Sequence, residues 1–145
     1  MARPDPERLA ALRSSRRANA VVERRLEVAL HRDHDLPLAW FDLLAALHEA
    51  GGKLRAHELA EQVMVHKSSL SRQLDRLEDE GYVRRDRAED DGRGLVVVLT
   101  KEGRACWRQA LPTYRRIAQQ AFCSHLTDTD LAALTRLSGK ILLGE

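Results

Sequence analysis

The sequence predicts a mostly α-helical protein with one small β-hairpin, and three observations support this fold class. Apolar residues recur at helical spacing in several segments, as in Leu70, Leu74 and Leu77. The run Leu95–Leu99 is rich in valine and too short for a helix, so it suits a strand. The charged, glycine-bearing stretch 86–94 that precedes this run is typical of a hairpin loop.

Size and composition fit one domain with a modest core. The chain has 145 residues, of which 43% are hydrophobic and only 4% aromatic, so the core must be mostly Leu, Val and Ala. The formal net charge of +2 is no argument for a nucleic-acid partner by itself. Positive charge would have to be concentrated locally for such a partner.

Targeting signals are missing from the sequence pattern. No apolar run approaches membrane-spanning length, and the segment Met1–Pro6 lacks the apolar centre of a signal peptide. The two cysteines are too few for a secreted disulfide framework. We therefore expect a soluble, cytoplasmic protein with no membrane partner.

Two helices are expected in the first third of the chain. The first covers about Glu7–His31 and has a basic, polar middle, so it should pack in two places rather than along one stripe. A loop over His31–Asp35 follows. Pro37 suits the first turn of a second helix, which runs to Ala50 and stops at a glycine pair.

A short third helix and a longer fourth helix come next. The third is centred on Leu59, Ala60 and Val63. The fourth begins near Ser68, whose hydroxyl can cap it, and ends at Gly81.

The hairpin and a fifth helix follow. The strand Tyr82–Arg85 is expected to pair with Leu95–Leu99. Thr100 can cap a fifth helix that reaches about Ser124. Pro112 should kink this helix without breaking it, because the apolar phase is the same on both sides.

The C-terminal segment predicts a sixth helix that begins with a capping box at Thr127–Asp130. One face of the fifth helix carries Trp107, Leu111, Tyr114, Ala118, Ala121 and Phe122, and one face of the sixth carries Leu131, Leu134, Ser138, Ile141 and Leu142. These apolar faces are larger than a small lobe needs for its own core. We therefore expect a second copy of the chain to pack against them. The alternative is that they fold back onto the first helix of the same chain.

The fourth helix also carries groups that suit a DNA groove. Opposite its leucines lie Ser68, Arg72 and Asp75, flanked by Ser69 and Arg76. A serine hydroxyl can bond a phosphate or base edge, and an arginine can bond guanine with two hydrogen bonds. The alternative is an ordinary solvated helix face.

The hairpin loop places Asp91 two residues before Arg93. Such a carboxylate can hold the guanidinium extended, and an extended arginine fits the narrow minor groove of A·T-rich DNA. The alternative is an ordinary charged hairpin.

Taken in series, these elements resemble the MarR family of winged helix-turn-helix transcription regulators. The likeness is carried by His57–Glu61, by Ser68–Val83 and by Asp90–Gly103, and Leu38–Leu47 is similar to the helix that precedes the motif in that family. The resemblance implies a single MarR-like domain over 1–145, with a winged-helix lobe at about 36–100. Dimerisation helices are then expected at about 7–31 and 101–145.

The resemblance also implies which residues bind. The expected DNA-binding residues are Lys67, Ser68, Ser69, Ser71, Arg72, Arg76, Asp91 and Arg93. In each protomer the segment from Ser68 to Arg76 would enter a major groove, and Arg93 would reach the minor groove. Family members commonly bind small aromatic acids or phenols, and the residues expected near such an effector are Arg16, Arg17, His34, Trp40 and Phe41. The alternative for Trp40 and Phe41 is that they are core residues.

Other groupings argue against catalysis. The segment His57–Glu61 begins like a zinc-protease helix but lacks the second histidine. No serine, histidine and aspartate grouping with supporting motifs and no phosphate-binding glycine loop is present, so we expect neither an enzyme nor a cofactor.

Two further groups of residues could respond to a metal ion or to an oxidant. Possible metal ligands cluster at His31, Asp33, His34 and Asp35, but such a polar loop is usually solvated, so no metal site is assigned. Cys106 lies in the first turns of the fifth helix, where a helix N-terminus can lower a thiol pKa. The peroxide-sensing cysteine of some family members lies in the first helix, and this chain has none there. We therefore expect Cys106 and Cys123 to be small buried or indifferent thiols.

The sequence thus predicts a homodimeric repressor that binds a pseudo-palindromic operator in double-stranded DNA and is released by a small-molecule effector. Two alternatives stay open. One is a winged-helix module that docks protein partners without sequence-specific DNA binding, and the other is a zinc-sensing regulator.

Overall fold

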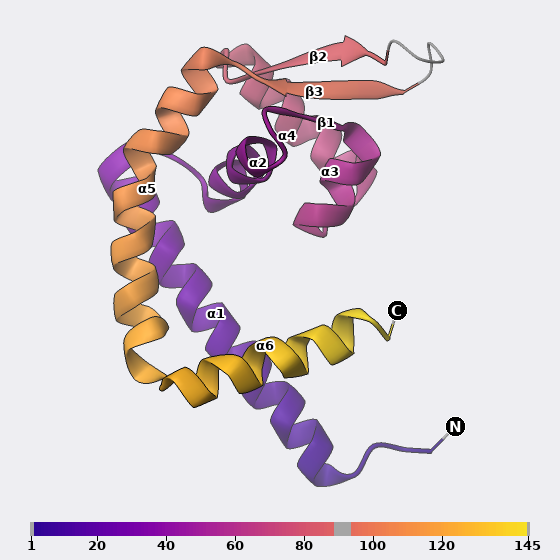
Figure 1. The fold of residues 1–145 in the computed structure, drawn as a ribbon, viewed down its shortest axis with the longest axis vertical. Helices are drawn as coiled ribbons and strands as arrows, with labels where there is room; N and C mark the ends of the chain where they lie inside the picture. The colour runs from indigo at the N-terminus through magenta and orange to yellow at the C-terminus, as the bar shows by residue number, and fades with distance from the viewer. Residues whose placement is uncertain (1, 89–93, 145) are drawn as a thin grey trace. The chain divides into compact units, whose positions relative to one another are not determined.

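The computed structural model describes residues 2–88 and 94–144 (Figure 1). In chain order its elements are α1 (Pro6–His34), α2 (Leu38–Glu49), β1 (Lys53–Arg55), α3 (Ala56–Val63), α4 (Lys67–Asp79), β2 (Val83–Arg87), β3 (Leu95–Leu99), α5 (Lys101–Ala121), the 3₁₀ turn η1 (Cys123–His125) and α6 (Asp128–Leu142). The mostly helical fold class with a small β wing is confirmed.

The strands form one antiparallel sheet in the order β1-β3-β2. In the predicted hairpin Val83 pairs with Leu99 and Arg87 with Leu95, so β2 extends two residues beyond the expected strand end. The strand β1 was not predicted. Its central residue Leu54 pairs with Val97, which places β3 in the middle of the sheet.

Contacts divide the chain into two compact units. One consists of residues 30–113, and the other of residues 1–29 together with residues 114–145. The helix α5 belongs to both, since the division falls between Thr113 and Tyr114.

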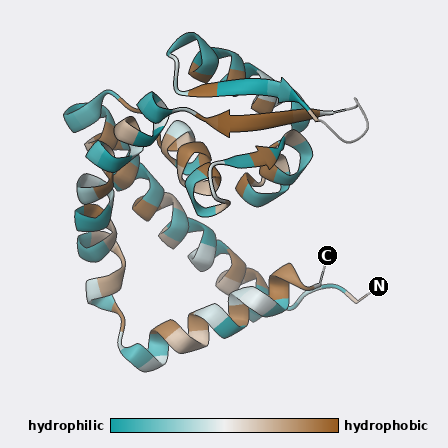
Figure 2. Cartoon of the chain, turned by 45° about the horizontal axis from the view of Figure 1, so that its top comes forward, coloured by the Kyte–Doolittle hydropathy of each residue, from teal (hydrophilic) through white to brown (hydrophobic). Residues whose placement is uncertain are grey.

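The unit of residues 30–113 has a continuous apolar core. It is formed by Leu43, Leu44, Ala46, Leu47, Leu59, Ala60, Leu70, Leu74, Leu77, Val83, Val97 and Leu99. Figure 2 shows β3 as an apolar strand, in which Val97 and Leu99 are buried and Val96 and Val98 are half-buried. Leucine and valine make up most of this core, as the composition predicted.

The unit of residues 1–29 and 114–145 is far more exposed. Its large apolar side chains with substantial exposure include Leu9, Leu12, Val21, Val28, Phe122, Leu134, Leu137, Ile141, Leu142 and Leu143. A groove of about 810 Å³ lies within this unit, lined by side chains of α1, of the end of α5 and of α6. In the parts of the chain that the structure describes, no helix is long and apolar enough to cross a membrane.

Several predicted boundaries were wrong. The helix α1 continues through His34 instead of ending at His31. It ends where Asp35 adopts the left-handed conformation, at φ 50°, and the Leu36 N–H bonds the Leu30 carbonyl. All residues of the expected loop except Asp35 therefore belong to the last turn of the helix.

Two expected helix starts and one helix end also differ. Pro37 is the residue before α2 rather than part of its first turn. Ser68 does not cap α4, which begins at Lys67 after an extended His66 with no side-chain cap. The helix α5 ends at Ala121 rather than near Ser124.

Two other predicted caps were right. The Thr127 hydroxyl accepts from the Asp130 N–H at 3.1 Å, and the Asp130 carboxylate accepts from the Thr127 N–H at 2.9 Å. The hydrogen bonds to Thr127 lower the pKa of Asp130. At the start of α5 the Thr100 hydroxyl accepts from the Gly103 N–H at 3.0 Å.

Candidate nucleic-acid interface

The helices α3 and α4 form a helix-turn-helix. The turn begins at Met64, which adopts the left-handed conformation at φ 56°, and the Val65 N–H bonds the Ala60 carbonyl at 3.1 Å. His66 is then extended, and α4 begins one residue later. This turn sets the direction of α4 relative to α3.

The two sides of α4 differ as predicted. Leu70, Leu74 and Leu77 are buried in the core. The side chains of Lys67, Ser68, Ser71, Arg72 and Arg76 are exposed, and Ser69 is half-buried. The structure therefore brings the predicted helix residues onto one accessible element, and their contact with DNA stays a prediction.

Asp75 has a different environment from the one expected. It accepts a hydrogen bond from Arg85 of β2, with Nη2 and Oδ1 2.6 Å apart. Glu78, one turn further along α4, accepts from Nε of the same arginine at 3.2 Å and from its backbone N–H at 3.1 Å. The hydrogen bonds with Glu78 and Asp75 raise the pKa of Arg85. Asp75 thus belongs to a contact with the sheet.

A second side chain contacts α4 from α2. The indole N–H of Trp40 donates to Oε1 of Gln73 at 2.8 Å. The Trp40 ring also meets Tyr82 edge-on, with ring centroids 6.5 Å apart. Neither Gln73 nor Arg85 was singled out from the sequence, because each of them contacts a residue of a different helix or strand, and such a contact leaves no local pattern.

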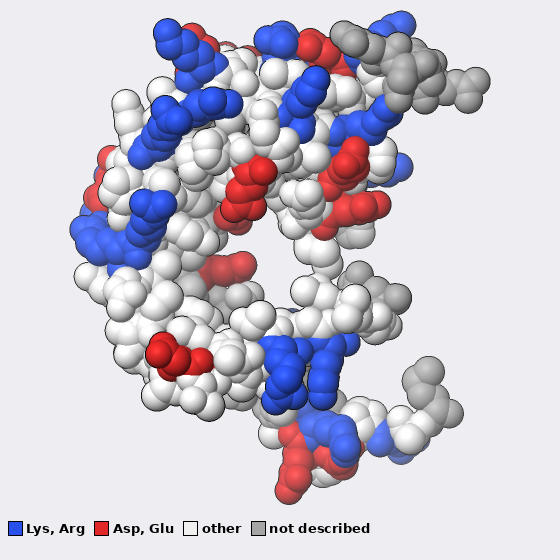
Figure 3. Space-filling view, in the orientation of Figure 1, with Lys and Arg blue, Asp and Glu red and all other residues white. Residues whose placement is uncertain are grey.

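The tip of the hairpin carries the predicted pair Asp91 and Arg93, and both residues lie outside the described residues. Their role in the minor groove stays a prediction. In Figure 3 basic side chains lie over the sheet and the start of α5, with acidic side chains between them. One such pair is Arg84 with Asp86 on β2, at 3.0 Å.

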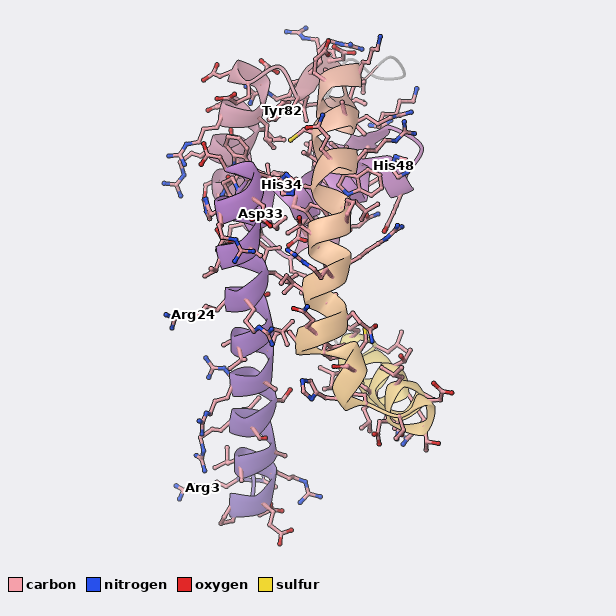
Figure 4. All side chains as sticks on the ribbon, turned by 90° about the vertical axis from the view of Figure 1, so that its left-hand side faces the viewer. Arg3, Arg24, Asp33, His34, His48 and Tyr82 are labelled. Carbon is pink, nitrogen blue, oxygen red and sulfur yellow. The ribbon has the colours of Figure 1, made fainter. Side chains whose placement is uncertain are left out.

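The residues expected near an effector fall in both units. Arg16 and Arg17 are exposed on α1 in the unit that contains residues 1–29. The other three belong to residues 30–113. Phe41 is only 2% exposed and lies in the core, whereas Trp40 is half-buried. His34, labelled in Figure 4, has Nε2 2.8 Å from the Thr113 hydroxyl of α5.

The possible metal ligands do not form a site. Among residues 2–88 and 94–144, no three His, Cys, Asp or Glu side chains gather as they would around a metal ion. Asp33 instead pairs with its neighbour Arg32 at 2.8 Å.

The thiol of Cys106 is not activated by its place at the start of α5. Burial raises the pKa of Cys106, and a hydrogen bond with Tyr82 offsets this only in part. The thiol is therefore protected rather than activated.

A helix-turn-helix supported by a three-stranded antiparallel sheet defines the winged-helix class of DNA-binding proteins. Comparison with known proteins shows to which family of this class the chain is similar. A profile of the MarR family matches residues 34–94. An uncharacterized HTH-type transcriptional regulator from Bacillus cereus is 34% identical over 107 residues, which are 74% of this chain and 70% of the relative.

Solved structures agree over nearly the whole chain. Sco3205, a MarR family transcriptional regulator from Streptomyces coelicolor solved in complex with DNA, is 30% identical with a TM-score of 0.90, and the match covers 99% of this chain and 91% of that one. A mutant MarR from E. coli complexed with operator DNA is 28% identical with a TM-score of 0.82, over 96% of this chain and 99% of that one. This chain belongs to the MarR family, and it is a transcriptional regulator rather than an enzyme.

Proposed function

We propose that this chain is a homodimeric repressor that binds a pseudo-palindromic operator and is released from it by a small aromatic or phenolic effector. The observation that carries the proposal is the exposed face of α4. It presents Arg72, Arg76 and serine hydroxyls opposite a buried leucine stripe, in a family whose members have been solved on DNA. The helix offers donors for both phosphates and base edges.

In this proposal the residues that contact DNA are Lys67, Ser68, Ser69, Ser71, Arg72 and Arg76 in the major groove, with Arg93 in the minor groove and Asp91 as its brace. The lobe of about 36–100 supplies these contacts. The segments of about 7–31 and 101–145 supply the dimer interface.

The homodimer is supported by the apolar surface of the unit of residues 1–29 and 114–145. On α6, Leu134 is 40% exposed, Leu137 46% and Ile141 76%, which a stable single chain would not leave in water as a contiguous stripe. On α1 the groove in the same unit is lined by apolar and polar residues, namely Ala10, Ala18, Val21 and Val22 together with Arg13, Ser14 and Arg17. A second copy offers complementary apolar helices for both surfaces.

The effector part of the proposal rests on the family and on two partly exposed side chains. Trp40 can stack on an aromatic ring, and His34 can bond a carboxylate or phenol oxygen. Arg16 and Arg17 are candidate partners for an anionic group. We expect the protein to act in the cytoplasm, where its operator lies.

The test is selection from a pool of random duplexes at a fixed salt concentration. The expected result is enrichment of an inverted repeat whose half-site centres lie about 10 base pairs apart, or a multiple of that spacing. A scrambled copy of the selected duplex serves as the control. Failure to enrich any sequence would favour the protein-docking module instead.

Two additions to the binding assay separate the remaining alternatives. Benzoate and phenol are titrated into the complex with the selected duplex, and release by either supports the effector proposal. Zn²⁺ and EDTA are titrated in parallel. A response to zinc alone would favour the zinc-sensing regulator.

A further inference from the structure

The contact between α4 and the sheet depends on Arg85, a charged residue on the face of β2 that packs against the core. On β2, Val83 and Arg85 share a face of the strand, and the register pairs Arg85 with Val97 at the centre of the core. The side chain of Arg85 therefore leaves β2 on the face of the sheet against which the helices pack. Its side chain is only 22% exposed.

Arg85 uses both its backbone and its side chain to hold α4. The guanidinium bonds Asp75 and Glu78, which are three residues apart on the helix, and the backbone N–H bonds Glu78 as well. Charge-assisted bonds of this kind are short and directional. One residue of the sheet therefore binds two successive turns of α4.

A second polar contact lies on the other side of the leucine stripe. At about 100° per residue, Glu78 and Gln73 lie about 70° to either side of the centre of the stripe formed by Leu70, Leu74 and Leu77. Glu78 contacts β2 through Arg85, and Gln73 contacts α2 through Trp40. The two contacts together oppose rotation of the helix in either direction.

Rotation matters because Arg72 lies about 170° from the centre of the stripe. A leucine stripe alone is non-directional and tolerates a small roll of the helix. With a side-chain radius of about 6 Å, a roll of about 10° moves the exposed face by about 1 Å. A paired contact to a base edge tolerates about 0.5 Å.

We propose that Arg85 is a positioning residue for sequence recognition: by holding Asp75 and Glu78, it fixes the rotation of α4 and so aims Arg72 at its base. This inference rests on the proposed function, since it assumes that α4 reads DNA. Arg85 acts through the helix, without touching the operator itself.

The first test removes the acidic half of the contact with the double variant Asp75→Ala, Glu78→Ala, because asparagine and glutamine would keep a carbonyl oxygen that can still accept from Arg85. Loss of two carboxylates lowers repulsion of phosphates, so affinity for the scrambled duplex should hold or rise. The ratio of selected-duplex to scrambled-duplex affinity should nevertheless fall about tenfold, the loss expected when one paired base contact is misplaced. The control is Asp79→Ala, Glu80→Ala, which removes two exposed carboxylates nearby and should keep the ratio.

The second test changes the arginine. Arg85→Met should lower the same ratio, and Arg85→Lys should restore part of it by keeping one charged bond. The matched control is Arg84→Met on the same strand, whose side chain is 60% exposed and pairs with Asp86 on the opposite face. Thermal unfolding of each variant identifies any that are not folded. If Arg85→Met is one of them, the double variant provides the test, since it keeps Arg85 and replaces only exposed carboxylates of α4.

The outcomes separate the two proposals. If the wild-type protein prefers the selected duplex and the double variant keeps that preference in full, the positioning role of Arg85 is overturned and the proposed function stands. If both affinities rise by the same factor in the double variant, the carboxylates act only through charge and the inference also fails. If the wild-type protein shows no preference, the proposed function itself is wrong.

Discussion

The unit of residues 30–113 and the unit of residues 1–29 with 114–145 differ in how they use their apolar residues. The first buries them: nearly all described core side chains, from Leu30 to Ala110, belong to it. In the second, only Leu26, Ala29 and Ile117 are buried among the described residues. Most of its other large apolar side chains, such as Leu12, Ile141 and Leu143, are exposed in the single chain.

This difference indicates two sources of stability. A unit with a continuous core can be stable through its own contacts, and its unfolding should not depend on protein concentration. A unit with exposed apolar faces gains stability from association, which follows mass action. The following predictions would break or sharpen this comparison.

The largest effect is expected on α6. Leu134→Asp or Ile141→Asp should yield monomer or unfolded protein, because burying a carboxylate in an apolar interface costs several kcal/mol, on the order of 3–5. Sedimentation equilibrium measures the result. Ala132→Asp, on the opposite side of α6, is the control and should remain dimeric. A stable dimer in both leucine and isoleucine variants would remove this face from the interface.

The next effect concerns the packed unit. Leu77→Ala removes a fully buried side chain between α4 and the sheet, and should lower the free energy of unfolding by about 2–5 kcal/mol. Chemical denaturation at two protein concentrations measures the change. The loss should be the same at both, and a loss that grows on dilution would show that this unit also depends on the partner copy.

Arg72→Ala tests recognition by the packed unit. Discrimination between the selected and scrambled duplexes should fall by about 1–3 kcal/mol, the range for a base contact with two hydrogen bonds. Binding titrations on both duplexes measure it. An equal loss of affinity for both would make Arg72 a phosphate contact.

Arg93→Ala tests the tip of the wing. Binding should weaken, and the slope of affinity against salt should fall by about one ion. Any preference for A·T pairs at the flanks should lessen, because the narrow minor groove attracts an extended arginine. Asp91→Ala should give a milder form of the same defect. Unchanged binding by folded Arg93→Ala protein would mean that the wing does not contact DNA.

The smallest effect is on thiol chemistry. Burial raises the pKa of Cys106, so less thiolate is present at a given pH in the folded state than in the unfolded one. The buried thiol thus favours folding below the unfolded-state pKa, and this contribution is lost as pH rises through the folded-state pKa. In Cys123→Ser protein, iodoacetamide should alkylate Cys106 more slowly in buffer than in urea at pH 8. Equal rates would contradict protection by packing.

Local patterns predicted much of this fold. The leucine spacing of α4, the valine run of β3 and the capping box at Thr127 each depend on residues close in sequence. The strand β1 escaped prediction because Lys53–Arg55 is short and mostly charged. It is a strand because it pairs with Val96–Val98, more than forty residues away in the chain, and such pairing leaves no local signal.

Part of the candidate DNA-binding site could likewise be predicted from local sequence patterns, and part could not. The exposed row on α4 follows from helical periodicity, which places Arg72 opposite the leucines. The contact of Arg85 with Asp75 could not be predicted from periodicity, because a charged residue in a strand gives no indication of which helix it contacts. The expected cap at Ser68 failed for a related reason: the backbone turn at Met64 set the start of α4, overriding side-chain preference.

The close approach at Gly103 limits which sequences this fold can accept. A Cβ added there would lie 2.0 Å from the Tyr82 carbonyl oxygen, a backbone atom that cannot move aside as a side-chain end can. A Cβ added at Gly139 would meet nothing within 4 Å. The first turn of α5 therefore packs directly against the backbone that follows α4. Homologous sequences that keep this junction should retain glycine at position 103, whereas position 139 has room for a side chain in the single chain.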